Sequence, residues 1–354
     1  MKPNQIFFKK SKILPTDKFF RNVLYDKKFG YYTSQMPFGK NGDFITSPKI
    51  SSIFSEIIAI WIVSSWETFG KPKNFNIVEL GPGDGSLANT LLKTLKKFPE
   101  FNSIKNMFLL EKSVFLRKVQ RKKISNKDVK WIDSLNKIKK GPIVFFGNEF
   151  FDAIPIKQFK RKKNLLHEKY LFLNKNYQIK EIFKKAAYQD IKKINSYKTF
   201  KNLKFIEYPK SGLIELQKVI NKIEKSKGCL LLIDYGYTKS NNKNTLQSVF
   251  KHKKNFIFNN LGKADVTSHV NFKLLEEFFL KNKLSIKKTV TQRLFLQNMG
   301  IKERANIIAK KMNFREQSNI YLRLKRLLSP NLMGNLFKVI LAHNFKTDKY
   351  FGFN

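Results

Sequence analysis

Residues 76–87, with the sequence Asn-Ile-Val-Glu-Leu-Gly-Pro-Gly-Asp-Gly-Ser-Leu, limit the possible folds of this chain more than any other stretch. A short apolar run ends at Glu79, and Gly81, Gly83 and Gly85 follow before apolar residues resume at helical spacing. Glycine lets a backbone turn tightly and approach a ligand, and the N–H groups at a helix N-terminus favour phosphate and other anions. The pattern therefore predicts a strand, a nucleotide-binding loop and a helix within a doubly wound α/β sheet.

The spacing Gly-x-Gly-x-Gly after a strand-end acid resembles the first motif of S-adenosylmethionine-dependent methyltransferases. A dinucleotide site more often has Gly-x-Gly-x-x-Gly, which counts against NAD. A different nucleotide binder or a plain turn remains the alternative for the loop. A second apolar run, 107–110, ends at Glu111. An acid at the end of this next strand can accept hydrogen bonds from both ribose hydroxyls, so Glu111 is predicted to bind the nucleoside. The alternative is a solvated strand-end carboxylate.

A third apolar run, 142–146, is followed by Asn148, Glu149 and Asp152. Ligands meet the carboxyl ends of the strands in a doubly wound sheet, so these side chains are expected beside the transferred methyl group. Carboxylates pair with a guanidinium in a bidentate fork, and localising its charge leaves one nitrogen lone pair for attack. We therefore predict catalytic roles for these three residues in methylating a cationic acceptor. The alternative for Glu149 is a surface salt bridge.

Four further residues are candidates for the acceptor site. Phe150 and Phe151 are predicted to wall the pocket, although core packing is the alternative for them. Asp234 ends another apolar run and could equally serve a structural turn. Asp265 lies in a polar loop, where capping of a helix is the alternative role.

Composition restricts the class of protein. The 354 residues carry a net charge of +44, from either a genome-wide lysine bias or a selected anion-binding surface. Cys229, beside Leu230, is predicted to be a buried structural thiol, and the four histidines show no metal-ligand spacing, so no metal is predicted. No apolar run is long enough to cross a bilayer, and the N-terminus lacks signal-peptide features. These features together favour a cytoplasmic location.

The pattern along the chain predicts interleaved lobes rather than domains in series. Residues 1–70 form a helical, turn-rich segment that covers the donor site, and 71–156 form the first part of the core. Alternating short segments in 157–210, with a turn at 174–176, predict an inserted antiparallel substrate lobe. Residues 211–354 complete the core and carry a further insertion at about 238–267.

Taken in order, these segments resemble the MidA-like family of methyltransferases, which includes a mitochondrial complex I assembly factor that methylates a protein arginine. The resemblance rests on Gly30-Tyr31-Tyr32, on residues 42–48, on the glycine loop, and above all on 148–155, with 234–236, 264–272 and 333–339 following in order. It implies a Rossmann-like class I core with an added substrate lobe and S-adenosyl-L-methionine as cofactor. It also implies that Gly42, Asp43, Thr46 and Ser47 lie over the donor.

The chain departs from the family pattern at a few positions. Asp84 stands where the family usually has arginine, Lys49 where it often has an acid, and Val114 where it usually has proline. None of these changes removes a loop glycine or Glu111. A reversed charge at position 84 could alter how the donor or the substrate is held.

The sequence thus predicts a protein-arginine N-methyltransferase acting on a protein, by analogy a subunit of respiratory complex I. A nucleic-acid methyltransferase fits the charge but not the carboxylate-rich acceptor edge, which repels phosphates. A non-catalytic assembly or interaction factor is the third alternative, and the intact glycine loop counts against it. The sequence does not determine the oligomeric state.

Overall fold

Strand β2 (Phe75–Leu80), which precedes the glycine loop, lies inside the largest sheet of the computed structural model. The structure describes residues 3–34, 46–124, 129–138, 140–347 and 350–353. These residues divide between two units, which are interleaved along the sequence. One unit comprises 1–44, 151–217 and 237–278, and the other comprises 45–150, 218–236 and 279–354. We call the first the antiparallel unit and the second the sheet unit.

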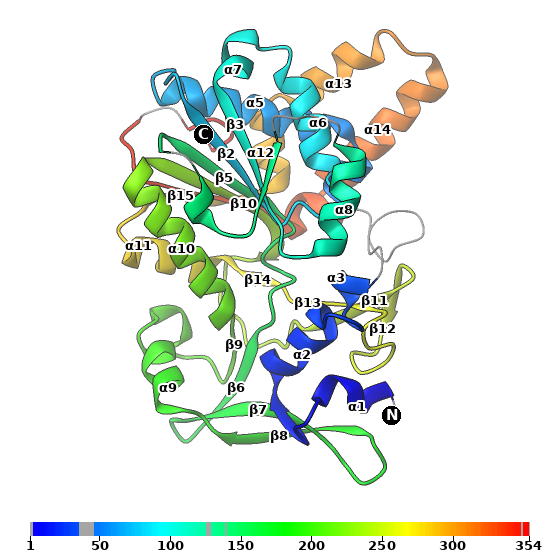
Figure 1. Ribbon diagram of the computed structural model, residues 1–354, viewed down its shortest axis with the longest axis vertical. Helices are drawn as coiled ribbons and strands as arrows, with labels where there is room; N and C mark the ends of the chain where they lie inside the picture. Colours follow the sequence, from blue (N-terminus) through cyan, green and yellow to red (C-terminus); the bar gives the residue numbers. More distant parts are fainter. Residues whose placement is uncertain (1–2, 35–45, 125–128, 139, 348–349, 354) are drawn as a thin grey trace. The chain divides into compact units, whose positions relative to one another are not determined.

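The sheet unit takes its elements from three stretches of the chain, as the colours of Figure 1 show. Its strands are β2, β3 (Lys105–Leu110), β4 (Val129–Ile132), β5 (Ile143–Asn148), β10 (Gly228–Tyr237), β15 (Ser285–Thr291) and β16 (Phe337–His343). Its helices and helical turns are α4 (Ser47–Ile50), α5 (Ser52–Thr68), α6 (Ser86–Leu95), α7 (Pro99–Ile104), α8 (Val114–Lys123), η1 (Leu135–Lys137), α12 (Gln292–Asn298), α13 (Ile301–Ala309), α14 (Phe314–Leu328) and η3 (Pro330–Gly334). Helix α10 (Lys210–Ser226) enters it from the antiparallel unit, and α11 (Phe272–Lys281) crosses the other boundary.

The strands of this sheet follow the order β15-β16-β10-β5-β2-β3-β4. Strands β10, β5, β2, β3 and β4 pair in parallel, while β16 is antiparallel to both of its neighbours. Every residue of β2 is buried, as expected for a parallel strand covered on both faces. The parallel sheet predicted for a Rossmann-like class I core is therefore present. The carboxyl ends of β2, β3, β5 and β10 meet at one edge of the sheet.

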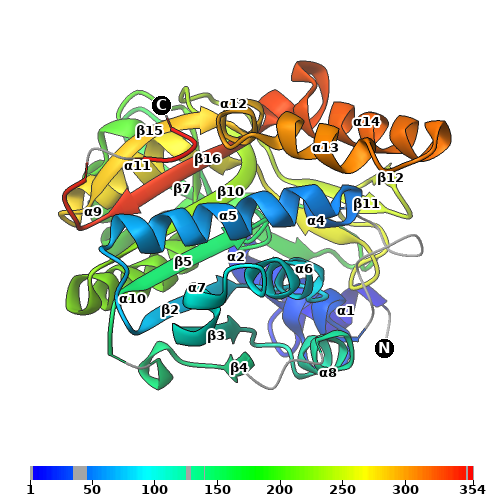
Figure 2. The same cartoon turned by 90° about the horizontal axis from the view of Figure 1, so that it is seen from above.

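Helix α5 lies along one face of this sheet, as Figure 2 shows. Its apolar side chains pack with those of β2, α6, β10 and β16 in one large cluster. Ile53, Ile58, Ala59 and Val63 point in different directions around this helix and are all buried, so most of its circumference is covered. Cys229 is buried in the same cluster, in agreement with its predicted structural role.

The antiparallel unit contains the predicted hairpin insertion and the N-terminal helices. Its strands are β1 (Ile13–Pro15), β6 (Lys157–Lys162), β7 (Leu165–Leu173), β8 (Ile179–Lys185), β9 (Phe205–Tyr208), β11 (Gln247–Phe250), β12 (Lys253–Asn255), β13 (Asp265–Thr267) and β14 (Val270–Asn271). Its helices and helical turns include α1 (Pro3–Phe8), α2 (Thr16–Tyr25), α3 (Tyr31–Ser34), α9 (Tyr188–Asn195) and η2 (Lys198–Phe200). Strands β7 and β8 flank the predicted turn at 174–176, and β11, β12 and β13 form a small sheet inside the insertion predicted at 238–267.

The boundaries of the units fall near residues 44, 150, 217, 236 and 278. The domain limits predicted at 70, 156 and 210 stay a prediction, as does the role of residues 1–70 as a cover over the donor site.

Candidate functional site

The glycine loop requires glycine at three positions. Gly81, Gly83 and Gly85 have φ angles of 63°, 56° and 77°, in the left-handed region that other residues avoid. A Cβ on Gly81 would stand 2.8 Å from Cδ2 of Phe150, so the Phe150 ring packs directly on the loop. Helix α6 begins immediately after Gly85. The loop thus brings bare backbone and a helix N-terminus to the carboxyl edge of the sheet, as the sequence predicts.

Glu79 is a buried carboxylic acid at the end of β2. Among the residues that the structure describes, no hydrogen-bond partner reaches its Oε2 atom. Burial, with the charges of Asp84 and Glu111 added to it, raises the pKa of Glu79 to about 8. A buried polar atom without a protein partner, next to the glycine loop, fits a site built for a polar ligand.

The raised pKa of Glu79 predicts how stability depends on pH. The folded pKa lies above the unfolded value of 4.5, so the stabilising contribution of Glu79 is complete below the unfolded pKa and is lost as the pH rises through 8. Between about pH 6 and about pH 9 the wild-type protein should lose more unfolding free energy than Glu79→Gln. Denaturant unfolding of both proteins checks this, with the exposed Glu67→Gln as control. Parallel curves for wild type and Glu79→Gln would contradict it.

Glu111 follows β3 and is held by its own neighbours. Its Oε1 accepts a hydrogen bond from the backbone N–H of Ser113 at 2.7 Å, and its Oε2 accepts one from Nε2 of Gln120 at 3.3 Å. The same Gln120 nitrogen donates to the carbonyl of Gly83 at 2.8 Å. Burial raises the pKa of Glu111, although the Ser113 and Gln120 hydrogen bonds oppose that shift. Gln120 therefore joins the ribose candidate to the glycine loop, a role that nothing in the sequence pattern indicates.

Asp84 sits in the glycine loop between two lysines from different helices. Nζ of Lys49 on α4 lies 2.7 Å from Oδ2 of Asp84, and Nζ of Lys123 on α8 lies 2.6 Å from the same oxygen. Burial opposes the charge of Asp84, but the hydrogen bonds from Lys123, Lys49 and Ser86 outweigh it and hold its pKa below the ordinary value. The contact between Lys49 and Asp84 gives both departures from the family pattern one explanation. The family often has an acid at position 49 and usually has arginine at position 84, whereas this chain has Lys49 and Asp84, so the two positions carry opposite charges in either case.

The ion pair between Lys49 and Asp84 predicts a compensated double substitution. Lys49→Glu and Asp84→Lys should each lower the unfolding free energy by about 2 kcal/mol or more, because each leaves like charges in a half-buried cluster. Together they restore an ion pair between positions 49 and 84, although the new lysine at position 84 also faces Lys123, and they should therefore recover part of that loss. Thermal unfolding of the four proteins measures the coupling. Additive losses in the double variant would show that the pair does not hold α4 to the loop.

Glu149 follows β5 in a strained backbone conformation. Its φ of 51° is uncommon for a residue other than glycine, and its backbone N–H donates to the carbonyl of Ile233 on β10 at 2.9 Å. Its Oε1 accepts hydrogen bonds from the backbone N–H of Ser47 at 3.2 Å and from Nδ2 of Asn148 at 3.0 Å. Strained residues of this kind cost about 1 kcal/mol or more and concentrate at functional sites. The predicted pair Asn148 and Glu149 is therefore brought together with Ser47.

Thr46, Ser47 and Asp234 also belong to the sheet unit. Thr46 is the N-cap residue of α4, which places Ser47 at its first position. Ser47 is fully buried. Asp234 is a buried residue of β10, directly after the carbonyl that binds Glu149, and its Oδ1 accepts the N–H of Tyr235. Gly42 and Asp43 lie outside the residues that the structure describes.

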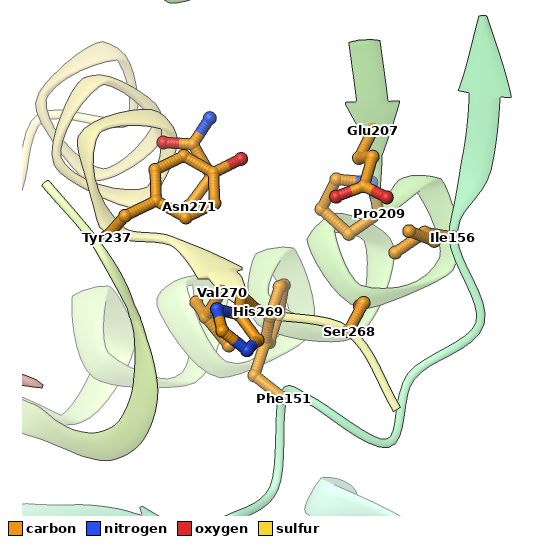
Figure 3. A pocket seen from close by; sticks show the side chains of 9 residues that line it. All are labelled: Phe151, Ile156, Glu207, Pro209, Tyr237, Ser268, His269, Val270 and Asn271. Carbon is orange, nitrogen blue, oxygen red and sulfur yellow. The ribbon is translucent and has the colours of Figure 1, made fainter. Parts of the chain in front are cut away.

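The remaining candidates, Phe151, Asp152 and Asp265, lie in the antiparallel unit. Phe151 packs against Gly212 and lines the cavity drawn in Figure 3. The backbone carbonyl of Asp152 accepts the N–H of Ser268, and Asp265 accepts hydrogen bonds from the Tyr32 hydroxyl at 3.0 and 3.1 Å. The carboxylate of Asp265 therefore has a hydrogen-bond partner within its own unit, and the contact of Asp152 is made by its backbone.

The cavity of Figure 3 contains one carboxylate that the sequence analysis did not single out, Glu207. Its lining residues are Phe151, Ile156, Glu207, Pro209, Tyr237, Ser268, His269, Val270 and Asn271. Burial raises the pKa of Glu207, although hydrogen bonds from Thr245 and Gln158 oppose that shift. Within the described part of the chain, no three His, Cys, Asp or Glu side chains are grouped to hold a metal ion. The absence of a metal stays a prediction. No helix in the described ranges is long and apolar enough to span a membrane.

Comparison with known proteins decides the family. The model of an S-adenosyl-L-methionine-dependent methyltransferase family matches residues 57–290, well over half of the chain. The chain belongs to this methyltransferase family. Its cofactor is S-adenosyl-L-methionine, and the glycine loop, the partnerless Glu79 oxygen and the strand-end Glu111 are residues that fit such a group.

Relatives and solved structures agree with this membership. The mitochondrial protein arginine methyltransferase NDUFAF7 of Xenopus laevis is 27% identical over 95% of this chain and 82% of its own length. The mitochondrial homologue of Drosophila melanogaster is 29% identical over 95% of this chain and 84% of its own length. A crystal structure of a COG1565 superfamily member from Burkholderia thailandensis, bound to S-adenosyl-homocysteine, has a TM-score of 0.79 at 21% identity, over 97% of this chain and 89% of that one. This likeness confirms the predicted fold.

The predicted cytoplasmic location is wrong. The relatives from Xenopus laevis and Homo sapiens are named as mitochondrial, which contradicts that prediction. The prediction rested on the absence of signal-peptide and membrane-spanning features. Those features do not distinguish the cytoplasm from the inside of an organelle.

Proposed function

We propose that this methyltransferase transfers the methyl group to an arginine side chain of a protein. The observation that carries the proposal is Glu149, held by Ser47 and Asn148 at the carboxyl edge of the sheet that also bears the glycine loop. The names of the relatives, which are protein arginine methyltransferases, support it. The resemblance to the MidA-like family extends the proposal to a respiratory complex I subunit as the acceptor.

Most of the residues proposed for the donor half of the site belong to the sheet unit. Gly81, Gly83 and Gly85 would hold the donor at the loop, and Glu111 would accept the ribose hydroxyls. Thr46 and Ser47, at the start of α4, are further donor-binding candidates, as are Gly42 and Asp43. When bound, S-adenosyl-L-methionine supplies an electrophilic methyl group on a sulfonium.

The acceptor half uses carboxylates to orient a cation. Glu149 accepts hydrogen bonds from the guanidinium and holds its positive charge on the nitrogens that do not react. Ser47 and Asn148 fix the carboxylate of Glu149 before the substrate arrives, so that carboxylate loses little conformational freedom when the substrate binds. Phe150 covers the glycine loop and excludes water from it. Asp152, Phe151, Asp234 and Asp265 remain candidates for contacts with the rest of the acceptor.

The test is the chemical identity of the methylated product. The purified protein is incubated with donor carrying a radiolabelled methyl group and with a mitochondrial extract, and the labelled protein is hydrolysed to amino acids. Label in methylarginine, absent when Glu149→Gln replaces the wild type, is the expected result. Label in methyllysine would contradict the proposal. Label that nuclease treatment removes would instead favour a nucleic-acid methyltransferase, for which the net charge of +44 is the supporting observation.

A further inference from the structure

Helices α13 and α14 form a hairpin that is anchored to the sheet unit at its base. In Figures 1 and 2 the two helices, in orange, run side by side. Nε of Arg304 lies 2.6 Å from Oε2 of Glu56 on α5, and Leu324, Leu327 and Leu328 at the end of α14 are buried in the core. The Tyr321 hydroxyl donates to Oδ1 of Asn306 at 3.0 Å and joins the two helices nearer the tip.

The part of this hairpin beyond its buried base exposes large apolar side chains. The exposed fractions are 85% for Phe314, 64% for Leu322, 57% for Ile307 and 46% for Tyr321. Residues seven and eight positions apart lie on neighbouring parts of a helix surface, so Phe314, Tyr321 and Leu322 share one side of α14. A group of large apolar side chains that is exposed to water commonly marks a binding surface.

The hydrogen bonds at the N-terminus of α14 fix the position of Phe314. Oδ1 of Asn313 accepts the N–H of Glu316 at 3.0 Å, and Oε2 of Glu316 accepts the N–H of Asn313 at 3.1 Å. This capping box fixes the first turn of α14. Phe314, at the first helical position, is therefore held outward by an ordered turn.

The apolar surface is surrounded by cations. Residues 301–328 contain eight Lys or Arg and only two Glu. The exposed cationic side chains of the hairpin are Lys302, Lys310, Lys311, Arg315, Arg323, Lys325 and Arg326. Exposed apolar side chains flanked by long cationic ones are the pattern of a helix that lies in the headgroup region of a membrane.

We propose that the α13–α14 hairpin binds an anionic lipid surface, with Phe314 and Leu322 entering the headgroup boundary. The cations supply attraction to the acidic headgroups, and the apolar side chains supply insertion. A protein partner is the less suitable occupant because lysine is depleted in protein interfaces. The proposal goes beyond the methyltransferase activity and does not depend on the identity of the acceptor.

Tryptophan fluorescence tests the insertion directly. Phe314→Trp is compared with Tyr188→Trp, whose side chain is 76% exposed on α9 in the antiparallel unit. Vesicles contain equal parts of phosphatidylcholine and phosphatidylglycerol, with or without bromine on the acyl chains. Brominated vesicles should quench the extra emission of Phe314→Trp and leave that of Tyr188→Trp unchanged. Unquenched emission from Phe314→Trp, or equal quenching in both variants, would overturn the proposal.

A sedimentation assay separates insertion from simple charge attraction. At physiological salt, Phe314→Ser with Leu322→Ser should bind these vesicles at least about tenfold more weakly than wild type. Tyr188→Ser with Phe256→Ser removes two aromatic side chains elsewhere, exposed to 76% and 64%, and should bind as wild type does. Circular dichroism confirms that both double variants fold. Equal binding of the two variants would show that the net charge alone is responsible, and the hairpin proposal would fail.

Discussion

Replacing Glu149 by glutamine is expected to lower the rate of methyl transfer by at least about a hundredfold while leaving donor binding unchanged. Glutamine keeps an oxygen that can accept the hydrogen bonds from Ser47 and Asn148, so the local structure survives. It removes the negative charge that orients the guanidinium. Single-turnover transfer to the acceptor measures the rate, and calorimetry with S-adenosyl-homocysteine measures donor binding.

The matched control for this substitution is Glu100→Gln. Glu100 is an exposed carboxylate of the same unit, near Lys71, and its neutralisation changes the net charge of the protein equally. That variant should transfer methyl groups at the wild-type rate. Activity close to wild type in Glu149→Gln would remove Glu149 from the acceptor site. Loss of donor binding together with activity would instead assign it a structural role.

Replacing Gly81 by valine is expected to abolish donor binding. The substitution puts a branched side chain at a φ of 63° and within 2.8 Å of the Phe150 ring, so the loop or the ring must move. A ligand at a hundred times its Kd stabilises the folded state by about 2.7 kcal/mol. Saturating S-adenosyl-homocysteine should therefore raise the Tm of the wild type by a few degrees and leave that of Gly81→Val unchanged.

Gly70 provides the control for backbone strain. It also has a positive φ, of 82°, but a Cβ there meets no atom within 4 Å. Gly70→Val should lose stability from strain and still show the full rise in Tm with ligand. If neither variant showed a rise in Tm with ligand, backbone strain transmitted through the sheet unit would explain the loss of donor binding. The close packing of Gly81 on Phe150 would then not be its cause.

Local sequence patterns were sufficient for the features that depend on few neighbouring residues. The strand, loop and helix around Gly81 could be predicted because three glycines at that spacing are typical of a tight loop whose residues adopt positive φ angles. The placement of Glu111 and Glu149 at strand ends could be predicted because an apolar run stops before each of them. The family resemblance ordered these local pieces into one fold.

Contacts between distant residues could not be predicted in the same way. The hydrogen bond from Ser47 to Glu149 and the bridge from Gln120 to Gly83 join segments that only tertiary packing brings together. The ion pair between Lys49 and Asp84 appeared in the sequence only as two unrelated departures from the family pattern, and Lys123 was not singled out at all. Phe151 and Asp152 directly follow Phe150 in sequence but belong to the other unit, a division that no local pattern marks.

The most direct test of this account is calorimetric titration of the purified wild-type protein with S-adenosyl-L-methionine and S-adenosyl-homocysteine. The account predicts binding of one equivalent of each, with micromolar Kd values. The absence of binding for both compounds would contradict it, because the glycine loop, Glu79 and Glu111 would then form a site without its ligand.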